Sequence, residues 1–561
     1  MKLACQRALV PCLLLAFNPP VAGQSQEWIR QFGTSSSEGA AGAAPDGVGG
    51  VYLTGGTSGD LGGPNAGDSD AWIARFDDAG RQLWVRQFGT SAGDGCGFAA
   101  VDGTGGIFVG GSTSGALVGP GSGVSSAWIA RYDAQGERIW ARQFGSSFTS
   151  CSGAAMDGTG GAFFGGTTYG SLAAPNAGGP DAWIARHDAS GNQLWIRQFG
   201  TGGWDSCSEV ISDGEGGVLA CGPTRSSLFG PSAGLRDAWV ARYDAAGNLL
   251  WGRQFGSNEG EECWGAASDG AGGIYVTGVT EGSLGGPNSS FDVWDVWLAR
   301  YDGDGNQLWL RQFGSDDYDE CHAATPDGVG GVYLAGRTPG MIAGPGQAPG
   351  WPETWIARFD AAGAQLWIRQ FGSSDLDASS AMARDDRGGV YLAGSTRGDL
   401  GGPNAGSEDA WLARFDAKFD ATRYCTAPVP NSTGEWSQMT VTGSNRVADN
   451  DLSLCASQLP LGSVGFFLTS QERGFTANPG GSAGNLCLDA NIGRYVGPGQ
   501  IQSSRNEATF KLAVDLGQTP APTGLVAVQP GETWNFQAWH RDSVGGVATS
   551  NFTDAVSVTF R

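Results

Sequence analysis

The sequence has 561 residues, of which 96 are glycine and 21 are tryptophan, while only 16% are charged. A glycine inside a helix costs about 1 kcal/mol, so this composition excludes a helix-dominated protein. The 40% of hydrophobic residues argues against disorder, and the net charge of −23 makes nucleic acids and anionic membrane surfaces unfavourable partners. Abundant glycine with short apolar runs instead predicts an all-β protein.

Residues 1–23 have the pattern of a secretory signal peptide. Positively charged residues precede an apolar run from Ala8 to Phe17, and small residues at 21–23 offer a cleavage site. The apolar run is about ten residues long, which is too short to span a bilayer. We therefore expect an exported protein without a transmembrane segment, located outside the cell, at the cell surface or in the periplasm.

Two tryptophan motifs recur through residues 24–422, with spacings of 55 to 58 residues. The first motif, Trp-x-Arg-Gln-Phe-Gly, begins at Trp28, Trp84, Trp140, Trp195, Trp251, Trp309 and Trp367. The second motif, usually Asp-Ala-Trp-Ile-Ala-Arg, places its tryptophan at Trp72, Trp128, Trp183, Trp239, Trp297, Trp355 and Trp411. A fixed period of this kind indicates seven copies of one supersecondary unit.

Each repeat predicts four short strands joined by turns. In the second repeat the expected strands cover 96–101, 107–113, 127–132 and 138–144. Glycine-containing turns link the first pair and the last pair, because glycine adopts positive φ at little cost. Four-stranded repeats of this length are typical of propeller blades. A stacked solenoid is the alternative, but its repeats are usually shorter and need capping ends.

The two ends of the repeat region are complementary. Residues 28–32 form an outer strand that has no blade of its own, and the last repeat leaves the pattern after 409–416, where its fourth strand should begin. Pairing these two segments removes the open edge of a sheet. We therefore expect a seven-bladed β-propeller that is closed by the N-terminal strand.

The repeat resembles a known family. Segment 99–113 contains Ala-Ala-Val-Asp-Gly followed by Gly-Ile-Phe-Val-Gly-Gly-Ser-Thr, and segment 127–133 reads Ala-Trp-Ile-Ala-Arg-Tyr-Asp. Both are similar to the SBBP family of seven-bladed β-propeller repeats in exported bacterial proteins. The resemblance implies the fold and export, and it brings no shared catalytic set. The tryptophan-rich outer strands are also similar to those of quinoprotein propellers, but the turn at 133–136 differs from theirs, and no cofactor is expected.

Residues 423–561 contain neither motif and are expected to form a separate domain. Alternating runs at 509–514, 534–539 and 556–560 predict a small β-sandwich. Several segments of this region resemble a C-terminal module that is attached to many secreted bacterial proteins: 430–434, 484–488, 534–539 and 549–554. This resemblance implies no function for the module.

Cysteines recur at one inner-strand position of five consecutive repeats: Cys96, Cys151, Cys207, Cys263 and Cys321. We expect small buried residues there, and a ring of thiols that binds a soft metal is the alternative. Cys207 could form a bridge to Cys221 within its own hairpin. In the C-terminal domain we expect a disulfide between Cys425 and Cys487, which leaves Cys455 free, and an exported compartment permits such bonds.

Acidic residues gather in the loops that enter the inner strands. These loops emerge on the same face as the long loops between the second and third strands, and such loops commonly carry binding residues. Aromatic rings beside acidic groups suit sugar rings or cationic groups, although scattered acidic residues also serve solubility. The expected ligand site on this acidic, loop-rich face comprises Trp204, Asp205, Glu261, Glu262, Trp264, Asp316, Asp317, Tyr318, Asp319, Glu320 and Trp351.

The sequence offers little catalytic machinery. It has three histidines, and none has a partner at the spacing of a catalytic triad or a metal site. We therefore expect a non-catalytic binding or scaffold protein whose ligand is an extracellular protein or carbohydrate, with no metal and no nucleic acid partner. The alternative is a carboxylate-dependent hydrolase or lyase that acts on polysaccharides, which requires two carboxylates about 5 to 10 Å apart over a cleft.

Overall fold

The computed structural model describes residues 26–560 except 120–123, 146, 291–292, 344–350, 386–388, 416–421, 426–428, 444, 446, 448–449, 451 and 505–507. The expected signal peptide lies outside the described residues. The chain divides into two compact units between Phe415 and Asp416. The described residues form an all-β fold with two short 3-10 helices, η2 (Pro479–Gly481) and η3 (Leu516–Gln518). In the described part of the chain, no helix is long and apolar enough to cross a membrane.

The first unit is propeller-like and consists of four-stranded antiparallel sheets. In six of them the strand order follows the chain. These six are β2–β5 (Glu38–Pro45, Val51–Thr57, Asp70–Phe76, Gln82–Phe88), β6–β9 (Asp94–Val101, Ile107–Thr113, Ser126–Tyr132, Arg138–Phe144), β10–β13 (Thr149–Met156, Ala162–Thr168, Asp181–His187, Gln193–Phe199), β14–β17 (Glu209–Ser212, Val218–Thr224, Asp237–Tyr243, Leu249–Phe255), β18–β21 (Glu261–Ser268, Ile274–Thr280, Asp295–Tyr301, Gln307–Phe313) and β22–β25 (Glu320–Pro326, Val332–Thr338, Glu353–Phe359, Gln365–Phe371).

A seventh sheet joins the two ends of the repeat region. Its strands are β26 (Asp377–Arg384), β27 (Val390–Thr396), β28 (Asp409–Phe415) and β1 (Gln26–Phe32), in the order β26-β27-β28-β1. Trp28 pairs with Arg414 and Phe32 pairs with Ala410. The pairing expected between the first and last segments is therefore confirmed, and β1 covers what would otherwise be the open edge of β28.

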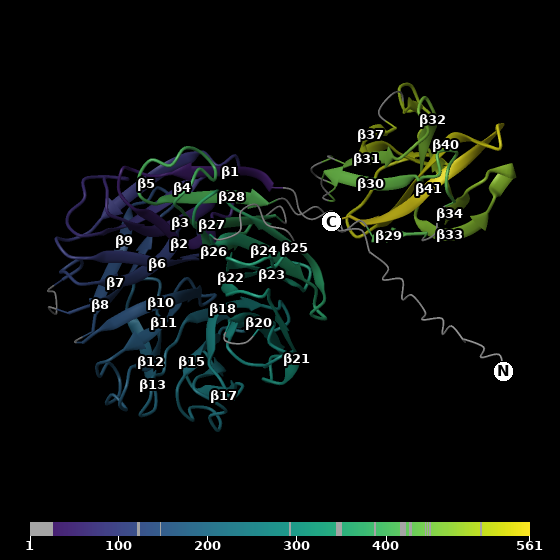
Figure 1. Ribbon diagram of the computed structural model, residues 1–561. Coiled ribbons are helices and arrows are strands. Elements are labelled where there is room, and N and C mark those ends of the chain that lie inside the picture. The colour runs from purple at the N-terminus through teal and green to yellow at the C-terminus, as the bar shows by residue number, and fades with distance from the viewer. Residues whose placement is uncertain are drawn as a thin grey trace, which may run out of the picture. The chain divides into compact units, whose positions relative to one another are not determined.

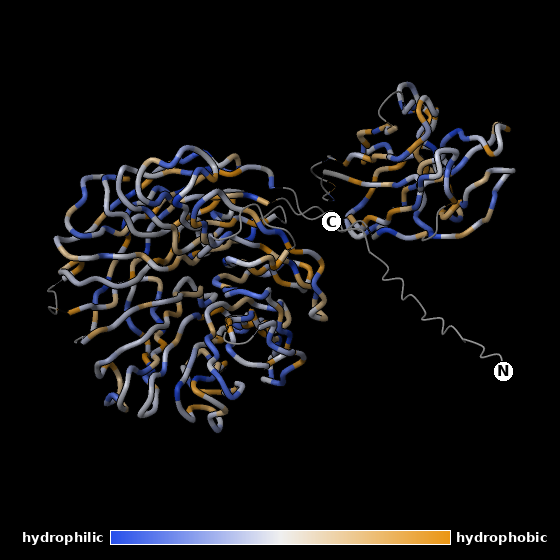
Figure 2. Tube along the Cα trace, viewed as in Figure 1, coloured by the Kyte–Doolittle hydropathy of each residue, from blue (hydrophilic) through white to orange (hydrophobic). Residues whose placement is uncertain are grey.

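The first strands of the seven sheets contact one another in chain order. β2 contacts β6, the series continues through β10, β14, β18, β22 and β26, and β26 contacts β2. The sheets therefore form a closed ring, whose strands are seen in Figure 1. Figure 2 shows that hydrophobic stretches are spread through all the sheets rather than gathered in one of them.

The core of the ring lies between neighbouring sheets. One buried cluster joins Tyr52 and Ile73 of the β2–β5 sheet to Trp128 of the β6–β9 sheet. Phe88 of the outer strand β5 meets Trp128 edge to face, with ring centroids 5.5 Å apart. The tryptophan on the third strand of each sheet is fully buried: Trp72, Trp128, Trp183, Trp239, Trp297, Trp355 and Trp411. The second tryptophan motif is therefore a packing motif.

A repeated polar contact also joins neighbouring sheets. The Arg131 guanidinium donates to Asp102 in the first turn of its own sheet (3.0 Å) and to the carbonyl of Ala189 in the next sheet (3.1 Å). The Trp140 indole N–H donates to the same carbonyl (3.0 Å). Burial raises the pKa of Asp102, but hydrogen bonds from Thr104 and Arg131 outweigh burial and lower it. The equivalent ion pairs are Arg75–Asp46, Arg186–Asp157, Arg242–Asp213, Arg300–Asp269, Arg358–Asp327 and Arg414–Asp385.

The second unit contains two larger sheets and two hairpins. The larger sheet has the order β29-β41-β40-β32-β35, with β36 also pairing with β32, and the other has the order β30-β31-β37. Their bounds are β29 (Thr422–Tyr424), β30 (Gln438–Gly443), β31 (Leu452–Ser457), β32 (Val464–Ser470), β35 (Gly493–Arg494), β36 (Gln502–Ser503), β37 (Phe510–Val514), β40 (Thr533–Val544) and β41 (Val547–Thr559). The hairpins are β33 (Glu472–Ala477) with β34 (Asn485–Asp489), and β38 (Thr519–Ala521) with β39 (Gly524–Val526).

One buried cluster joins the two larger sheets of the second unit. Leu454 and Phe510 come from the three-stranded sheet, and Phe467, Phe536 and Val556 come from the other. A disulfide between Cys425 and Cys487 connects the segment after β29 to β34, with the Cα atoms 6.0 Å apart. The disulfide expected from the sequence is therefore present, and Cys455 is free.

We predict that Arg131→Ala lowers the free energy of unfolding by about 2 to 4 kcal/mol, because it leaves the buried Asp102 carboxylate without its cation. The matched control is Arg81→Ala, which removes an ion pair with Asp77 whose arginine side chain is 79% exposed. The control should change stability by less than about 0.5 kcal/mol. Chemical denaturation of the two variants measures both values, and equal effects would contradict the structural role of the inter-sheet contact.

Candidate functional site

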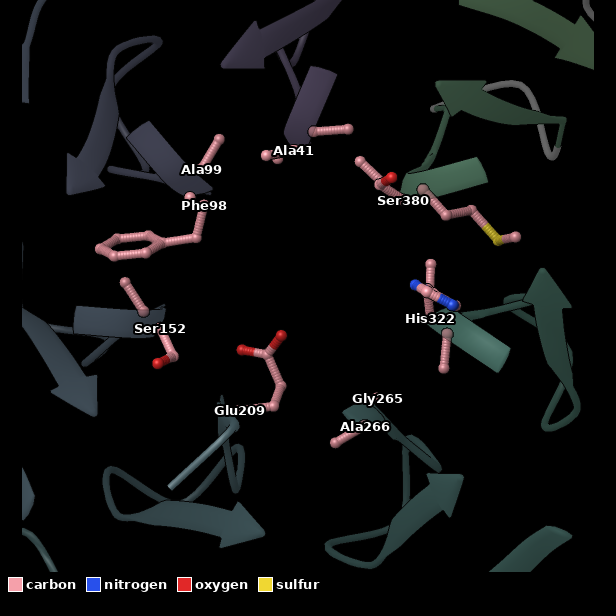
Figure 3. Close-up of a pocket in the computed structure, with 17 residues that line it drawn as sticks. Ala41, Phe98, Ala99, Ser152, Glu209, Gly265, Ala266, His322 and Ser380 are labelled. Atoms are coloured by element: carbon pink, nitrogen blue, oxygen red, sulfur yellow. The ribbon is translucent and has the colours of Figure 1, made fainter. Parts of the chain in front are cut away.

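The first strands of the seven sheets surround a small central cavity (Figure 3). The cavity has a volume of about 100 Å³, and most of its lining residues are alanine, glycine or serine. Figure 3 shows Ala41, Ser152, Glu209, His322 and Ser380 arranged around the opening. Among the described lining residues, the titratable side chains are Glu209 and His322. These two side chains are therefore the ionisable groups that a molecule entering the cavity would meet.

Glu209 departs from the repeat at the start of β14. The equivalent positions of the other six sheets hold Gly42, Phe98, Gly153, Gly265, Ala323 and Ala381. The Glu209 carboxylate accepts a hydrogen bond from the backbone N–H of Val210 (3.0 Å) and forms no ion pair with any described residue. Burial raises its pKa to about 8, so the carboxyl group is mostly protonated at neutral pH.

His322 lies on β22 and is held by a neighbouring carboxylate. Its Nε2 atom is 2.6 Å from the Glu320 carboxylate, which also accepts a hydrogen bond from Arg337 Nε (2.7 Å). Burial raises the pKa of Glu320, but the hydrogen bonds from His322 and Arg337 outweigh burial and hold it at about 2. His322 therefore has a carboxylate partner that its spacing from other residues in the sequence did not indicate, because strand pairing brings Arg337 and Glu320 together beside it.

Three further aromatic rings continue outward from His322. The ring of Trp264, on β18, lies 5.1 Å from the His322 ring and 6.2 Å from that of Trp294, measured between centroids. Trp294 precedes β20 and lies 5.8 Å from Tyr318, which precedes β22 and is 46% exposed. We call His322, Trp264, Trp294 and Tyr318 the aromatic run. It extends from the central cavity to the exposed loops of two adjacent sheets.

Three of the expected ligand-binding residues are internal. Asp205, Glu261 and Asp319 are fully buried, and each carboxylate accepts a hydrogen bond from the backbone N–H of the residue four positions earlier. The donors are Thr201 for Asp205, Ser257 for Glu261 and Ser315 for Asp319. The same contact recurs at Glu38, Asp94 and Asp377. These side chains hold the loop against the first strand, which corrects the prediction that they meet a ligand.

The remaining expected residues are dispersed over the loop face. Glu262 forms an ion pair with Arg236, as Glu320 does with Arg337. Asp316 is exposed and Asp317 is half-buried, and neither has an ion pair with a described residue. Trp204 and Trp351 are exposed but lie outside the aromatic run, and the Arg225 guanidinium lies 5.0 Å from the Trp204 ring. Of the expected residues, the structure brings together Trp264, Tyr318 and Glu320.

The five equivalent cysteines are buried free thiols. Burial raises the pKa of Cys96 and Cys321 to about 12, which keeps them uncharged. Among the described residues, no three His, Cys, Asp or Glu side chains are arranged to hold a metal ion. Cys207 and Cys221 are also free, because Cys221 pairs with Glu209 rather than with Cys207 across the hairpin. The bridge that the sequence allowed between them is therefore absent.

Sequence reasoning missed Glu209 and Trp294. Glu209 could have been found by aligning the repeats, because glycine or alanine occupies its position in five of the other six sheets. Trp294 has no such signal, because it lies in a loop whose length varies among the repeats. Only the spatial proximity of adjacent sheets shows that Trp294 contacts Trp264 and Tyr318.

No family model matches the chain. The chain is similar to the regulatory protein FlaEY of Caulobacter vibrioides, with 28% identity over 227 residues, which cover 38% of this chain and 23% of that protein. The chain therefore spans less than a quarter of the length of this curated relative. A puromycin hydrolase mutant complexed with PGG is 15% identical, with a TM-score of 0.34, over 67% of this chain and 52% of that one. A Trypanosoma rangeli sialidase in complex with 2,3-difluorosialic acid is 9% identical, with a TM-score of 0.27, over 96% and 92%. These TM-scores are too low to carry an argument about fold or function.

We predict that Glu209→Gln stabilises the protein increasingly as the pH rises from about 4.5 to about 8. Over this range the folded state retains the Glu209 proton that the unfolded state has lost, so the free energy of unfolding of the natural protein falls with pH. Glutamine does not ionise and removes this loss. Melting temperatures at pH 5 and pH 8.5 measure the effect, with Glu137→Gln, whose side chain is 74% exposed, as the control. If the melting temperatures of Glu209→Gln and the natural protein differed by the same amount at both pH values, the prediction would be contradicted.

Proposed function

We propose that the chain is an exported, non-catalytic binding protein, built from a seven-bladed β-propeller and a C-terminal β-sandwich. Support comes from the four-stranded sheets, the closed ring of first strands and the pairing of β1 with β28. The signal-like residues 1–23 and the Cys425–Cys487 disulfide are consistent with export. The resemblance of the repeats to the SBBP family supports the same reading.

The single observation that carries the binding role is the aromatic run. It joins the exposed loops to the central cavity, and His322 belongs to both. Tilted and edge-on rings with partly exposed faces suit the apolar face of a sugar ring, while Asp316 and Asp317, which directly precede Tyr318, supply hydrogen-bond acceptors. We therefore place an extracellular carbohydrate against the aromatic run, and a protein segment with exposed apolar groups is the second ligand class.

A carboxylate-dependent hydrolase is the second candidate function, and Glu209 is the observation that favours it. Its raised pKa of about 8 would keep it protonated, as a general acid requires. A glycoside hydrolase also needs a second carboxylate nearby, and Glu209 is the only carboxyl group among the described residues that line the cavity. The cavity of about 100 Å³ holds only about three water-sized groups. These two facts favour binding over hydrolysis.

A glycan and protein array first identifies a ligand. We predict that replacing Trp264 and Tyr318 together by alanine lowers the affinity for this ligand by at least about tenfold, because stacking on the partly exposed rings is lost. The control replaces Phe148 and Tyr169 by alanine, since these exposed rings also contact each other, at 5.6 Å, in the loops of another sheet. Titration of each variant measures the affinity. Loss of binding in the control with unchanged binding in the test variant would place the site elsewhere.

A further inference from the structure

The second unit contains a half-open cavity of about 380 Å³ that is separate from the ring. Its walls are mostly apolar and include Phe466, Leu486, Ile492, Trp539 and Phe552. Ligand pockets commonly have about 300 to 1,000 Å³ of space and are lined by apolar and aromatic groups with few polar ones. The cavity therefore has the size and the lining of a small-molecule site.

The cavity arises because one sheet is apolar on both faces. Side chains alternate along β32, so Phe467 is buried in the main core while Phe466 and Leu468 lie on the opposite face. On that face Phe466 pairs with Trp539 of β40, and their ring centroids are 5.0 Å apart. The β33–β34 hairpin covers this face only in part, since Phe466, Leu486, Ile492 and Trp539 remain partly exposed.

Arg494 is the only charged residue among the described residues that line this cavity. It lies on β35 opposite Leu468, and its guanidinium has no hydrogen bond or ion pair with a described residue. Two other arginines of this unit have partners: Arg423 Nε is 3.1 Å from the Asp554 carboxylate, and Arg473 lies 4.6 Å from the Tyr424 ring. An arginine without a protein partner at the rim of an apolar cavity can pair with the anionic group of a ligand whose apolar part fills the cavity.

We propose that this cavity binds a small apolar carboxylate, with its hydrocarbon part between Phe466, Trp539 and Phe552 and its carboxylate on the Arg494 guanidinium. At about 30 Å³ per water-sized group, the cavity holds about a dozen non-hydrogen atoms. A carboxylic acid with a chain of about ten carbons fits this volume. The planar guanidinium accommodates both carboxylate oxygens, which a hydroxyl or an ammonium head group would not exploit.

The test is isothermal titration calorimetry of the full chain with decanoate, decanol and decylamine. The natural protein should bind decanoate more tightly than decanol, and decylamine least. Arg494→Gln should weaken decanoate binding by about tenfold or more, since a charge-assisted pair is lost, and should leave decanol binding unchanged. Arg494→Glu should reverse the order, so that decylamine binds more tightly than decanoate.

The matched control is Arg473→Gln, which removes an arginine of the same unit that lies over Tyr424 instead of lining the cavity. This variant should bind decanoate like the natural protein. Because Arg494 is exposed, its variants should keep the natural melting temperature, which separates loss of the ligand site from loss of the fold. Absence of decanoate binding to the natural protein, equal binding of decanoate and decanol, or equal losses in Arg494→Gln and Arg473→Gln would overturn the proposal.

Discussion

The ring depends on the repeated contact between each sheet and the next. In the repeat, a half-buried arginine of the third strand neutralises a buried aspartate in its own sheet and donates to a carbonyl of the following sheet, where a tryptophan N–H of the outer strand also donates. The two hydrogen bonds to that carbonyl join one sheet to the next, while the ion pair lies within a single sheet. Because the same interactions recur from sheet to sheet, the residues of both tryptophan motifs are needed for packing, and substitutions at these positions would disturb it.

Functional variation is therefore confined to positions that the repeat leaves open. The first strands have small residues at the ring centre, and the loops above them differ in length and composition. Glu209, Trp264 and His322 all replace small residues of the inner strands or extend from them. The buried carboxylates near the start of the first strands resemble ligand-binding residues in the sequence. They recur because they hold the loops, as Asp205 and Glu261 do.

Strand order and the pairing of the first and last segments of the repeat region follow from the sequence, because the period, the turn glycines and the incomplete terminal repeats are local signals. Trp264 and Tyr318 could be placed in one sector for the same reason. The contact of Trp294 with both of them, and the isolation of Glu209 from any cation, depend on distances between sheets that no local pattern encodes. The burial of Asp205 and Asp319 was missed because composition alone does not separate an internal acceptor from an exposed one.

The central claim is that repeated residues hold the ring and that departures from the repeat form the site. It is tested most directly by the melting temperature, at pH 8, of a variant that restores residues typical of the repeat, Glu209→Gly, Trp264→Ser and His322→Ser. Because six other sheets keep their fold without Glu209 and its ionisation opposes folding at this pH, the melting temperature should equal or exceed that of the natural protein. A fall as large as that caused by Arg131→Ala would show that these three residues are structural and would contradict the account.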